Sequence, residues 1–304
     1  MRQKSLFSLR PVGASPRLSL VNTLVLLFLL GFQPVAGSPT AISPSIEPLS
    51  LGVYAHIRST EMIKKMRPLR EYLEKKLAAE GVFTRIRIRI FPTYDGAIRA
   101  LTEGEVDFVR FGPVSYVLAK QSNPRIKLLA MESNDGKKWF NGVISVPSDS
   151  PVRSIDDLKG RRVAFGSKSS TTGRYLAQAA LVKAGIRAHQ LAAHAYLGRH
   201  DKVAFAVASK SYDAGATNEN TYSKYAEKKG LRKILEFPCV TKPWVAREGL
   251  AARLFSALRS TLLSMKDESA LETIKRSGLL AAEDSDYDLI REAMEASSEF
   301  YSKP

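Results

Sequence analysis

Residues 162–166 read Arg-Val-Ala-Phe-Gly and residues 170–173 read Ser-Thr-Thr-Gly, and this stretch indicates the fold of the 304-residue chain. The apolar residues of the first segment predict a short strand. Residues 174–184 carry apolar side chains at helical spacing and end at Gly185, which predicts a helix. Three hydroxyls therefore gather at a helix N-terminus, whose unpaired N–H groups and macrodipole favour a phosphate-like anion. Simple capping of the helix by Ser170 is the alternative.

Strands and helices alternate along the chain, which predicts an α/β fold with helices on both faces of the sheets. In residues 85–90 arginine and isoleucine alternate strictly, as in a half-exposed strand whose charged face protects a sheet edge. Pro68 is expected to kink or break one helix. The expected strands cover residues 49–54, 86–91, 106–111, 126–130, 143–146, 162–166, 212–216 and 233–237. The expected helices cover residues 62–77, 94–102, 113–120, 154–160, 174–184 and 203–209, and the chain is expected to be helical from residue 244 to its end.

A second strand-to-helix junction has matching chemistry. Residues 112–116 read Gly-Pro-Val-Ser-Tyr after a strand, and a proline at the first helical position leaves nearby N–H groups free. Ligands of open α/β sheets bind beyond the carboxyl ends of the strands. We therefore expect two lobes, one formed by residues 38–141 plus 241–304 and the other by residues 142–240. Their two helix N-termini would hold a tetrahedral oxyanion from opposite sides of a cleft, and the lobes would close on it.

The first 37 residues have the pattern of a secretory signal peptide. Basic residues precede an apolar run, which is too short for a membrane span, and small residues follow it. No cysteine follows the run, so a lipid anchor is not expected, and the protein is expected in the periplasm. Cys239 is the only cysteine, which excludes an internal disulfide, and its apolar neighbours predict a buried structural thiol.

The formal net charge of +16 predicts attraction of anions. No motif that interleaves aromatic and basic residues points to nucleic acid. His194 and His200 are six residues apart without nearby carboxylates, so neither a metal site nor a cofactor is expected. Ser170 or Ser115 with His200 and Asp201 would supply the residues of a hydrolase triad. An adjacent His and Asp rarely orient each other in that way, and no Gly-x-Ser-x-Gly elbow is present, so we expect no enzyme.

The mature chain resembles the phosphate, phosphite and phosphonate solute-binding proteins of ABC transporters over nearly its whole length. The likeness lies in the order and spacing of several motifs rather than in any one of them. These are Gly52-Val53-Tyr54, Arg67-Pro68-Leu69, Gly104-Glu105-Val106-Asp107-Phe108, Phe111-Gly112-Pro113, Asp157-Leu158-Lys159-Gly160, Ser170-Thr171-Thr172-Gly173, His200-Asp201 and Asp213-Ala214-Gly215-Ala216. The resemblance implies a type II periplasmic-binding-protein fold, with two α/β lobes around a ligand cleft.

The resemblance also implies a set of ligand contacts. Ser170, Thr171, Thr172 and His200 would contact the anionic head group, and Tyr94, Tyr54, Ser115 and Tyr116 would form the wall of the first lobe. Glu219 matches an acid that some members direct at the other end of the ligand. Members that bind an aminophosphonate add a second acid in the returning segment, where this chain has Lys242. The departure favours phosphite, phosphate or a simple phosphonate.

An aromatic residue of the cleft is also implied, and both Trp139 and Phe140 stand at its place. The implied partner is the permease of an ABC importer, and a membrane sensor kinase is the alternative. The protein is expected to act as a monomer.

Overall fold

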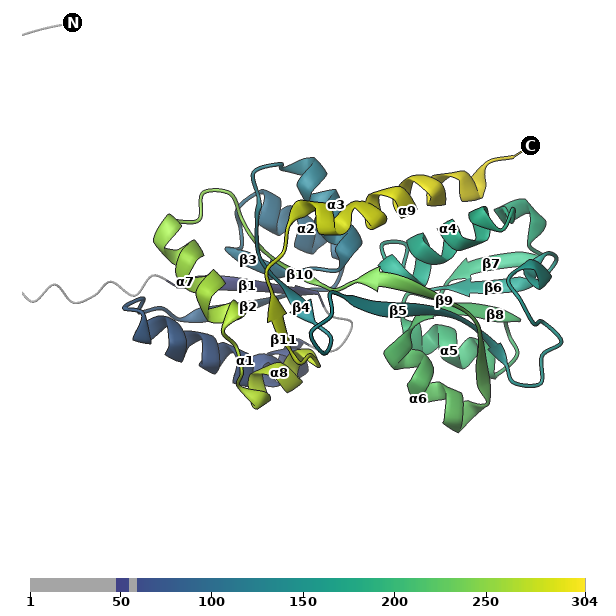
Figure 1. Cartoon of the computed structure of the whole chain (residues 1–304), viewed down its shortest axis with the longest axis horizontal. Coiled ribbons are helices and arrows are strands. Elements are labelled where there is room, and N and C mark those ends of the chain that lie inside the picture. The colour runs from purple at the N-terminus through teal and green to yellow at the C-terminus, as the bar shows by residue number, and fades with distance from the viewer. Residues whose placement is uncertain (1–47, 55–58, 304) are drawn as a thin grey trace, which may run out of the picture. The chain divides into compact units, whose positions relative to one another are not determined.

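The computed structural model describes residues 48–54 and 59–303, and its strands form two sheets (Figure 1). The predicted signal peptide of residues 1–37 lies outside the described residues. The first sheet has six strands in the order β11-β4-β10-β3-β1-β2. These strands are β1 (Leu49–Tyr54), β2 (Ile86–Phe91), β3 (Phe108–Arg110), β4 (Lys127–Ser133), β10 (Pro243–Ala246) and β11 (Gly278–Leu280). Strand β1 pairs in parallel with β2 and β3, and the other pairings are antiparallel.

The second sheet has five strands in the order β7-β6-β8-β5-β9. They are β5 (Trp139–Pro147), β6 (Arg162–Phe165), β7 (Ala193–Tyr196), β8 (Ala214–Asn218) and β9 (Leu231–Val240). The long antiparallel pair β5 and β9 joins this sheet to the first one, because β5 follows β4 along the chain and β9 leads into β10 (Figure 1). The two sheets with their helices form the two predicted α/β lobes.

Helices connect the parallel strands, as the alternating pattern predicted. The α-helices are α1 (Ser59–Ala79), α2 (Tyr94–Thr102), α3 (Pro113–Ser122), α4 (Leu176–Lys183), α5 (His200–Ala208), α6 (Glu219–Lys229), α7 (Ala252–Leu263), α8 (Glu268–Ile274) and α9 (Asp288–Ser298). Short 3₁₀ turns are η1 (Asp156–Leu158), η3 (Ala188–Gln190), η4 (Asp284–Tyr287) and η5 (Glu299–Tyr301), and η2 (Thr171–Tyr175) is a π-helical turn. Pro68 lies inside α1, and the helix continues past it.

The prediction of a helix from residue 244 to the end is wrong at two places. Pro243–Ala246 forms β10 in the middle of the first sheet, and Gly278–Leu280 forms β11 at its edge. Trp244, Val245 and Ala246 are fully buried between β3 and β4, so a run that reads as the start of an apolar helix is a central strand. The sequence patterns also did not indicate β7 or α6. The capped helix expected at 154–160 is the single turn η1, where the Asp157 carboxylate accepts the amide N–H groups of Arg153 and Ser154.

Strand β2 confirms the prediction for the arginine and isoleucine repeat. It lies at the edge of the first sheet, with Arg87 and Arg89 exposed and Ile86 buried. Charged side chains on an edge strand oppose pairing with a strand from another molecule.

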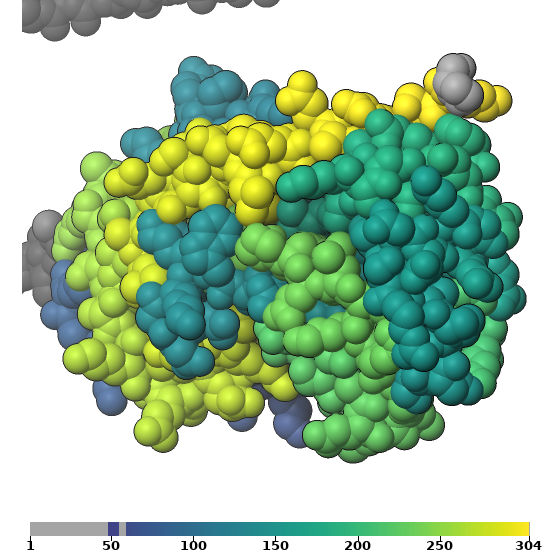
Figure 2. Space-filling model, turned by 45° about the vertical axis from the view of Figure 1, so that its right-hand side comes forward, coloured from purple at the N-terminus to yellow at the C-terminus, as the bar shows by residue number. Residues whose placement is uncertain are grey.

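The C-terminal helix α9 lies against helices of both lobes, α3 and α4 (Figure 1). The Ser297 hydroxyl donates to the side-chain oxygen of Gln178 in α4, and the Phe300 ring packs edge-on against Phe165 of β6. Figure 2 shows this C-terminal segment in yellow, lying along residues of the second lobe in teal. Residues 288–301 therefore contact the second lobe, although the predicted boundaries assign them to the first.

Candidate functional site

A cavity of about 570 Å³ lies between residues of the two lobes. Helix beginnings form most of its wall. Residues at or beside the N-termini of α2, α3, the η2–α4 helix, α5 and α6 all line the cavity, and they include Tyr94, Pro113, Ser170, His200 and Asn218. Each helix start carries backbone N–H groups that have no partner within the helix and a partial positive charge, so five of them on one cavity favour an anion. The sequence predicted two of these five.

Ser170 caps the helix that follows the opening motif. Its Oγ accepts the N–H of Gly173 at 3.1 Å, and its carbonyl oxygen accepts the N–H groups of Arg174 and Tyr175. The capping role is therefore real, and the residues that follow it, Thr171 and Thr172, line the same cavity. A π-helical turn at Thr171–Tyr175 widens the first turn of the helix, and such turns occur frequently at functional sites.

Gly173 is required by close packing. A Cβ at this position would lie 2.9 Å from Ser170 Oγ, 3.0 Å from His200 Cε1 and 3.1 Å from Gly166 Cα. The backbone N–H of Gly166 donates to the Gly173 carbonyl at 2.8 Å. The strand end, the helix start and the imidazole of His200 are thus held in direct contact.

Thr171 joins the two lobes. Its Oγ1 accepts the backbone N–H of Val114 at 3.1 Å, and Val114 is the second residue of α3 in the first lobe. Both residues are buried. The two helix starts that the sequence predicted to face each other are therefore in contact, and an N–H of one is satisfied by a hydroxyl of the other.

Two tyrosines form part of the wall of the first lobe. The rings of Tyr54 and Tyr94 are stacked, with centroids 3.7 Å apart and an angle of 28° between their planes. Burial is the main cause that raises the pKa of Tyr94 to about 12, and burial together with Tyr94 raises the pKa of Tyr54 as well. Both phenols therefore stay protonated at neutral pH, when they can act as hydrogen-bond donors.

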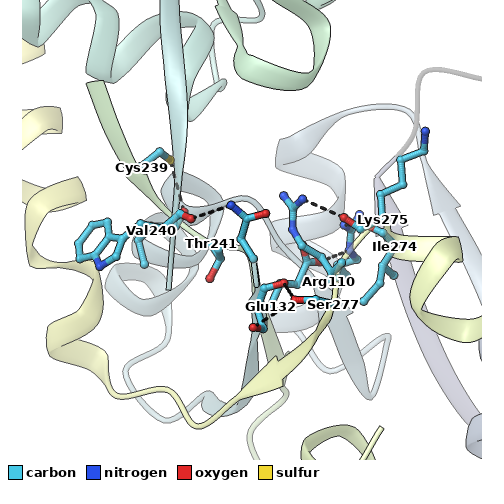
Figure 3. Close-up of polar contacts among 12 residues, drawn as sticks. Arg110, Glu132, Cys239, Val240, Thr241, Ile274, Lys275 and Ser277 are labelled. Atoms are coloured by element: carbon cyan, nitrogen blue, oxygen red, sulfur yellow. Dashed lines mark hydrogen bonds and ion pairs between the residues drawn. The ribbon is translucent and has the colours of Figure 1, made fainter. Parts of the chain in front are cut away.

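Basic side chains form another part of the wall. Figure 3 shows Arg110 beside Glu132, with Ile274 and Lys275 close by. The fully buried Glu132 carboxylate accepts hydrogen bonds from Nε of Arg110 at 2.5 Å and from Nε of Arg276 at 2.9 Å. Arg110, Arg276 and Lys242 all line the cavity. Repulsion from Arg110, together with burial, lowers the pKa of Lys242 to about 7.

Lys65 of α1 and Lys275 extend this basic region. Both line the cavity, and burial followed by repulsion from Lys275 and Arg110 lowers the pKa of Lys65. Lys275 ends α8 in the left-handed conformation, with φ of 56°. Residues other than glycine rarely adopt this conformation, and strained residues of this kind cluster at functional sites.

Six of the nine predicted contact residues line the cavity: Tyr54, Tyr94, Ser170, Thr171, Thr172 and His200. Ser115, Tyr116 and Glu219 are not among its lining residues. Ser115 and Tyr116 lie on the first turn of α3 and are buried, and the Tyr116 hydroxyl donates to Asp284 at 2.5 Å. Glu219 opens α6, and its neighbours Asn218, Asn220 and Thr221 line the cavity.

The structure distinguishes the two aromatic candidates of the cleft. Phe140 lines the cavity, whereas the Trp139 side chain is 43% exposed and is not among the lining residues. Successive residues of a strand point to opposite faces, and so only one of the two rings faces the cavity. Cys239 is fully buried, as predicted, and burial raises the pKa of its thiol.

Sequence reasoning missed most of the basic wall. Arg110 ends β3 at the carboxyl edge of the first sheet, so its position was a usable signal. Arg276 and Lys275 had no such signal, because they lie between α8 and β11, which both fall in the stretch read as continuous helix.

Among residues 48–54 and 59–303, no group of three or more His, Cys, Asp or Glu side chains is placed to hold a metal ion. Within the same ranges, every helix is too short or too polar to span a bilayer.

Residues 51–287 match the family of periplasmic substrate-binding proteins of phosphonate ABC transporters. The chain belongs to this family. Members of the family bind substrates for an importer and are not enzymes, in agreement with the prediction. The family assignment also confirms the resemblance that the sequence motifs indicated.

Named relatives have similar lengths. The chain is 26% identical to a probable ABC transporter phosphite-binding protein, PhnD1, of Prochlorococcus marinus, in an alignment that covers 76% of this chain and 80% of the relative. It is 25% identical to the phosphate-import protein PhnD of Mycolicibacterium smegmatis, with 81% and 84% covered. The structure of Prochlorococcus marinus PhnD1 in complex with methylphosphonate superposes with a TM-score of 0.69 at 24% identity, covering 83% of this chain and 98% of PhnD1. This likeness supports the two-lobe type II fold.

Proposed function

We propose that this protein captures a small phosphorus oxyanion in the periplasm and delivers it to the permease of an ABC importer. The observation that carries the proposal is the convergence of five helix N-termini on one cavity, with the hydroxyls of Ser170, Thr171 and Thr172 among them. The names of the relatives support the choice of ligand, since they specify phosphite, phosphate and methylphosphonate. Phosphite, phosphate and simple phosphonates share the tetrahedral head group that such a site would bind.

In the proposed complex, Ser170, Thr171, Thr172 and His200 contact the head group. Backbone N–H groups of the helix starts replace part of its hydration shell, and hydrogen bonds to a charged acceptor are stronger than neutral ones. Tyr54 and Tyr94 supply further donors from the first lobe. Ser115, Tyr116 and Glu219 are not part of the proposed contact set, because they do not line the cavity.

Residues 1–37 are proposed to act as the signal peptide that directs the protein to the periplasm, where it acts as a monomer. Capture involves no chemical step. The basic surface steers the anion, the lobes close on it, and the contact between Thr171 and Val114 marks one point of closure.

A thermal-shift panel tests the proposal. A ligand that binds the folded protein raises its melting temperature by mass action, so phosphite, phosphate or methylphosphonate should raise it, whereas sulfate should not. Calorimetry then measures affinity in the double variant Thr171→Ala, His200→Ala, which should lose binding and keep its fold. The exposed pair Thr60→Ala, His189→Ala is the matched control and should bind as the wild type does. A shift with sulfate alone, or equal affinity in both double variants, would refute the proposal.

A further inference from the structure

The basic wall of the cavity carries more positive charge than its acids neutralise. Six lining residues are cationic: Lys65, Arg110, Arg199, Lys242, Lys275 and Arg276. Asp201 is the acid among the described lining residues, and it is ion-paired with Arg199 of the second lobe. Glu132, which does not itself line the cavity, forms ion pairs with both Arg110 and Arg276. The first-lobe side of the cavity thus has five cationic lining residues and no acidic one among the described residues.

Among the three lysines of this wall, Lys242 is half-buried, whereas Lys65 and Lys275 are exposed. The two guanidinium groups are partly occupied, since Arg110 also donates to the Ile274 carbonyl and Arg276 to the Lys275 carbonyl. Lys242 forms no ion pair with a carboxylate of the described residues, although Glu132 is near enough to affect its pKa. Buried charges are stable only when paired, and so this ammonium group favours the arrival of an anion.

The basic wall and the proposed head-group site come from different lobes. Lys242 directly precedes β10, Arg110 ends β3 and Arg276 lies between α8 and β11, so all three lie in or beside strands of the first sheet. The hydroxyls of Ser170, Thr171 and Thr172 come from the second lobe. A cavity of about 570 Å³ falls in the range of about 300–1,000 Å³ that holds drug-sized ligands, which is more than one oxyanion requires.

An ammonium tail is disfavoured by the same geometry. Glu219 does not line the cavity, and Asp201 is held by Arg199, so neither acid is available to a cationic tail. We propose that the cavity is selective for a short phosphonocarboxylate, whose phosphonate lies among the helix starts and whose carboxylate is bound by Lys242. None of the three lysines that line the cavity forms an ion pair with a carboxylate of the described residues, and a single carboxylate matches Lys242, the only one of the three that is not exposed. This inference rests on the proposed function, because it assigns the second end of the same ligand.

Three ligands of matched length test the inference by calorimetry: 3-phosphonopropionate, propylphosphonate and 2-aminoethylphosphonate. The wild type should bind 3-phosphonopropionate about 10- to 100-fold more tightly than propylphosphonate, as expected for one added charge-assisted contact. The aminophosphonate should bind most weakly. Lys242→Met should abolish the preference for 3-phosphonopropionate, because it should lower the affinity for this ligand much more than the affinity for propylphosphonate. Lys127→Met removes an exposed lysine outside the cavity and is the control for net charge.

The outcomes separate this inference from the proposed function. If none of the phosphorus ligands binds, the proposed function itself fails. If propylphosphonate binds as tightly as 3-phosphonopropionate, or if 2-aminoethylphosphonate binds most tightly, the function stands and the carboxylate inference is overturned. Retention of the preference in Lys242→Met, with an unchanged melting temperature, would also overturn it.

Discussion

The hydrogen bond between Thr171 and Val114 makes closure of the lobes sensitive to one hydroxyl group. In the structure the Val114 N–H donates to Thr171 Oγ1 at 3.1 Å, and both residues are buried. When the lobes separate, water can satisfy this N–H group. Substitution of Thr171 by Val would keep the side chain's shape and leave the N–H without a partner only when the lobes are closed.

An unsatisfied buried donor costs about 1–3 kcal/mol, and here this cost destabilises the closed state relative to the open one. Apparent affinity falls with the population of the state that binds, so Thr171→Val should weaken ligand binding by about 5- to 150-fold. Loss of a direct contact with the ligand would add to this effect. Thr171→Ser keeps the hydroxyl group and should recover most of the affinity.

Calorimetric titration with methylphosphonate measures the affinities, and small-angle scattering of the ligand-free variants measures closure. Thr171→Val should be more open than either the wild type or Thr171→Ser. Affinity within twofold of the wild type, together with unchanged scattering, would refute the role assigned to this hydroxyl group.

Four other predictions concern the wall of the cavity. Repulsion from Arg110 and burial lower the pKa of Lys242 to about 7, whereas a bound anion would raise it. Binding of 3-phosphonopropionate at pH 8 should therefore take up protons. Proton uptake makes the calorimetric enthalpy depend on the buffer, and this dependence should be absent in Lys242→Met. Without ligand, the same lowered pKa predicts that Lys242 favours unfolding at low pH, so stability in urea should rise between pH 7 and 10 more in the wild type than in Lys242→Met. Lys275→Gly should raise the free energy of unfolding by up to about 1 kcal/mol, because glycine adopts the left-handed conformation without strain. An unchanged or lower urea midpoint would contradict this. Gly173→Ala should destabilise the protein by about 1–3 kcal/mol and weaken binding of methylphosphonate, because the added Cβ would press on Ser170 and His200. A wild-type urea midpoint together with wild-type affinity in calorimetry would contradict this.

Local patterns identified most of the strands and helices that carry the site. The alternating arginines of β2 predicted an edge strand, and the hydroxyl cluster at 170–172 predicted a helix start that lines the cavity. These features depend on residues close together in the sequence, so a pattern of a few residues contains the information. The region after residue 243 was misjudged for the opposite reason. Pro243–Ala246 is a strand because β3 and β4 lie on either side of it, and those partners are more than 100 residues away.

The site divides in the same way. The sequence by itself determined the helix starts at 112–113 and 170–173, because each depends on residue types at short spacing, and the motifs that carry the family resemblance, which in turn implied His200 as a ligand contact. Only the tertiary structure decided that Phe140 rather than Trp139 lines the cavity, that Tyr116 and Glu219 do not line it, and that Arg110 and Arg276 meet at Glu132. The physical reason is that these choices depend on which segments pack together across the sheets, and long-range packing leaves no local pattern in the sequence.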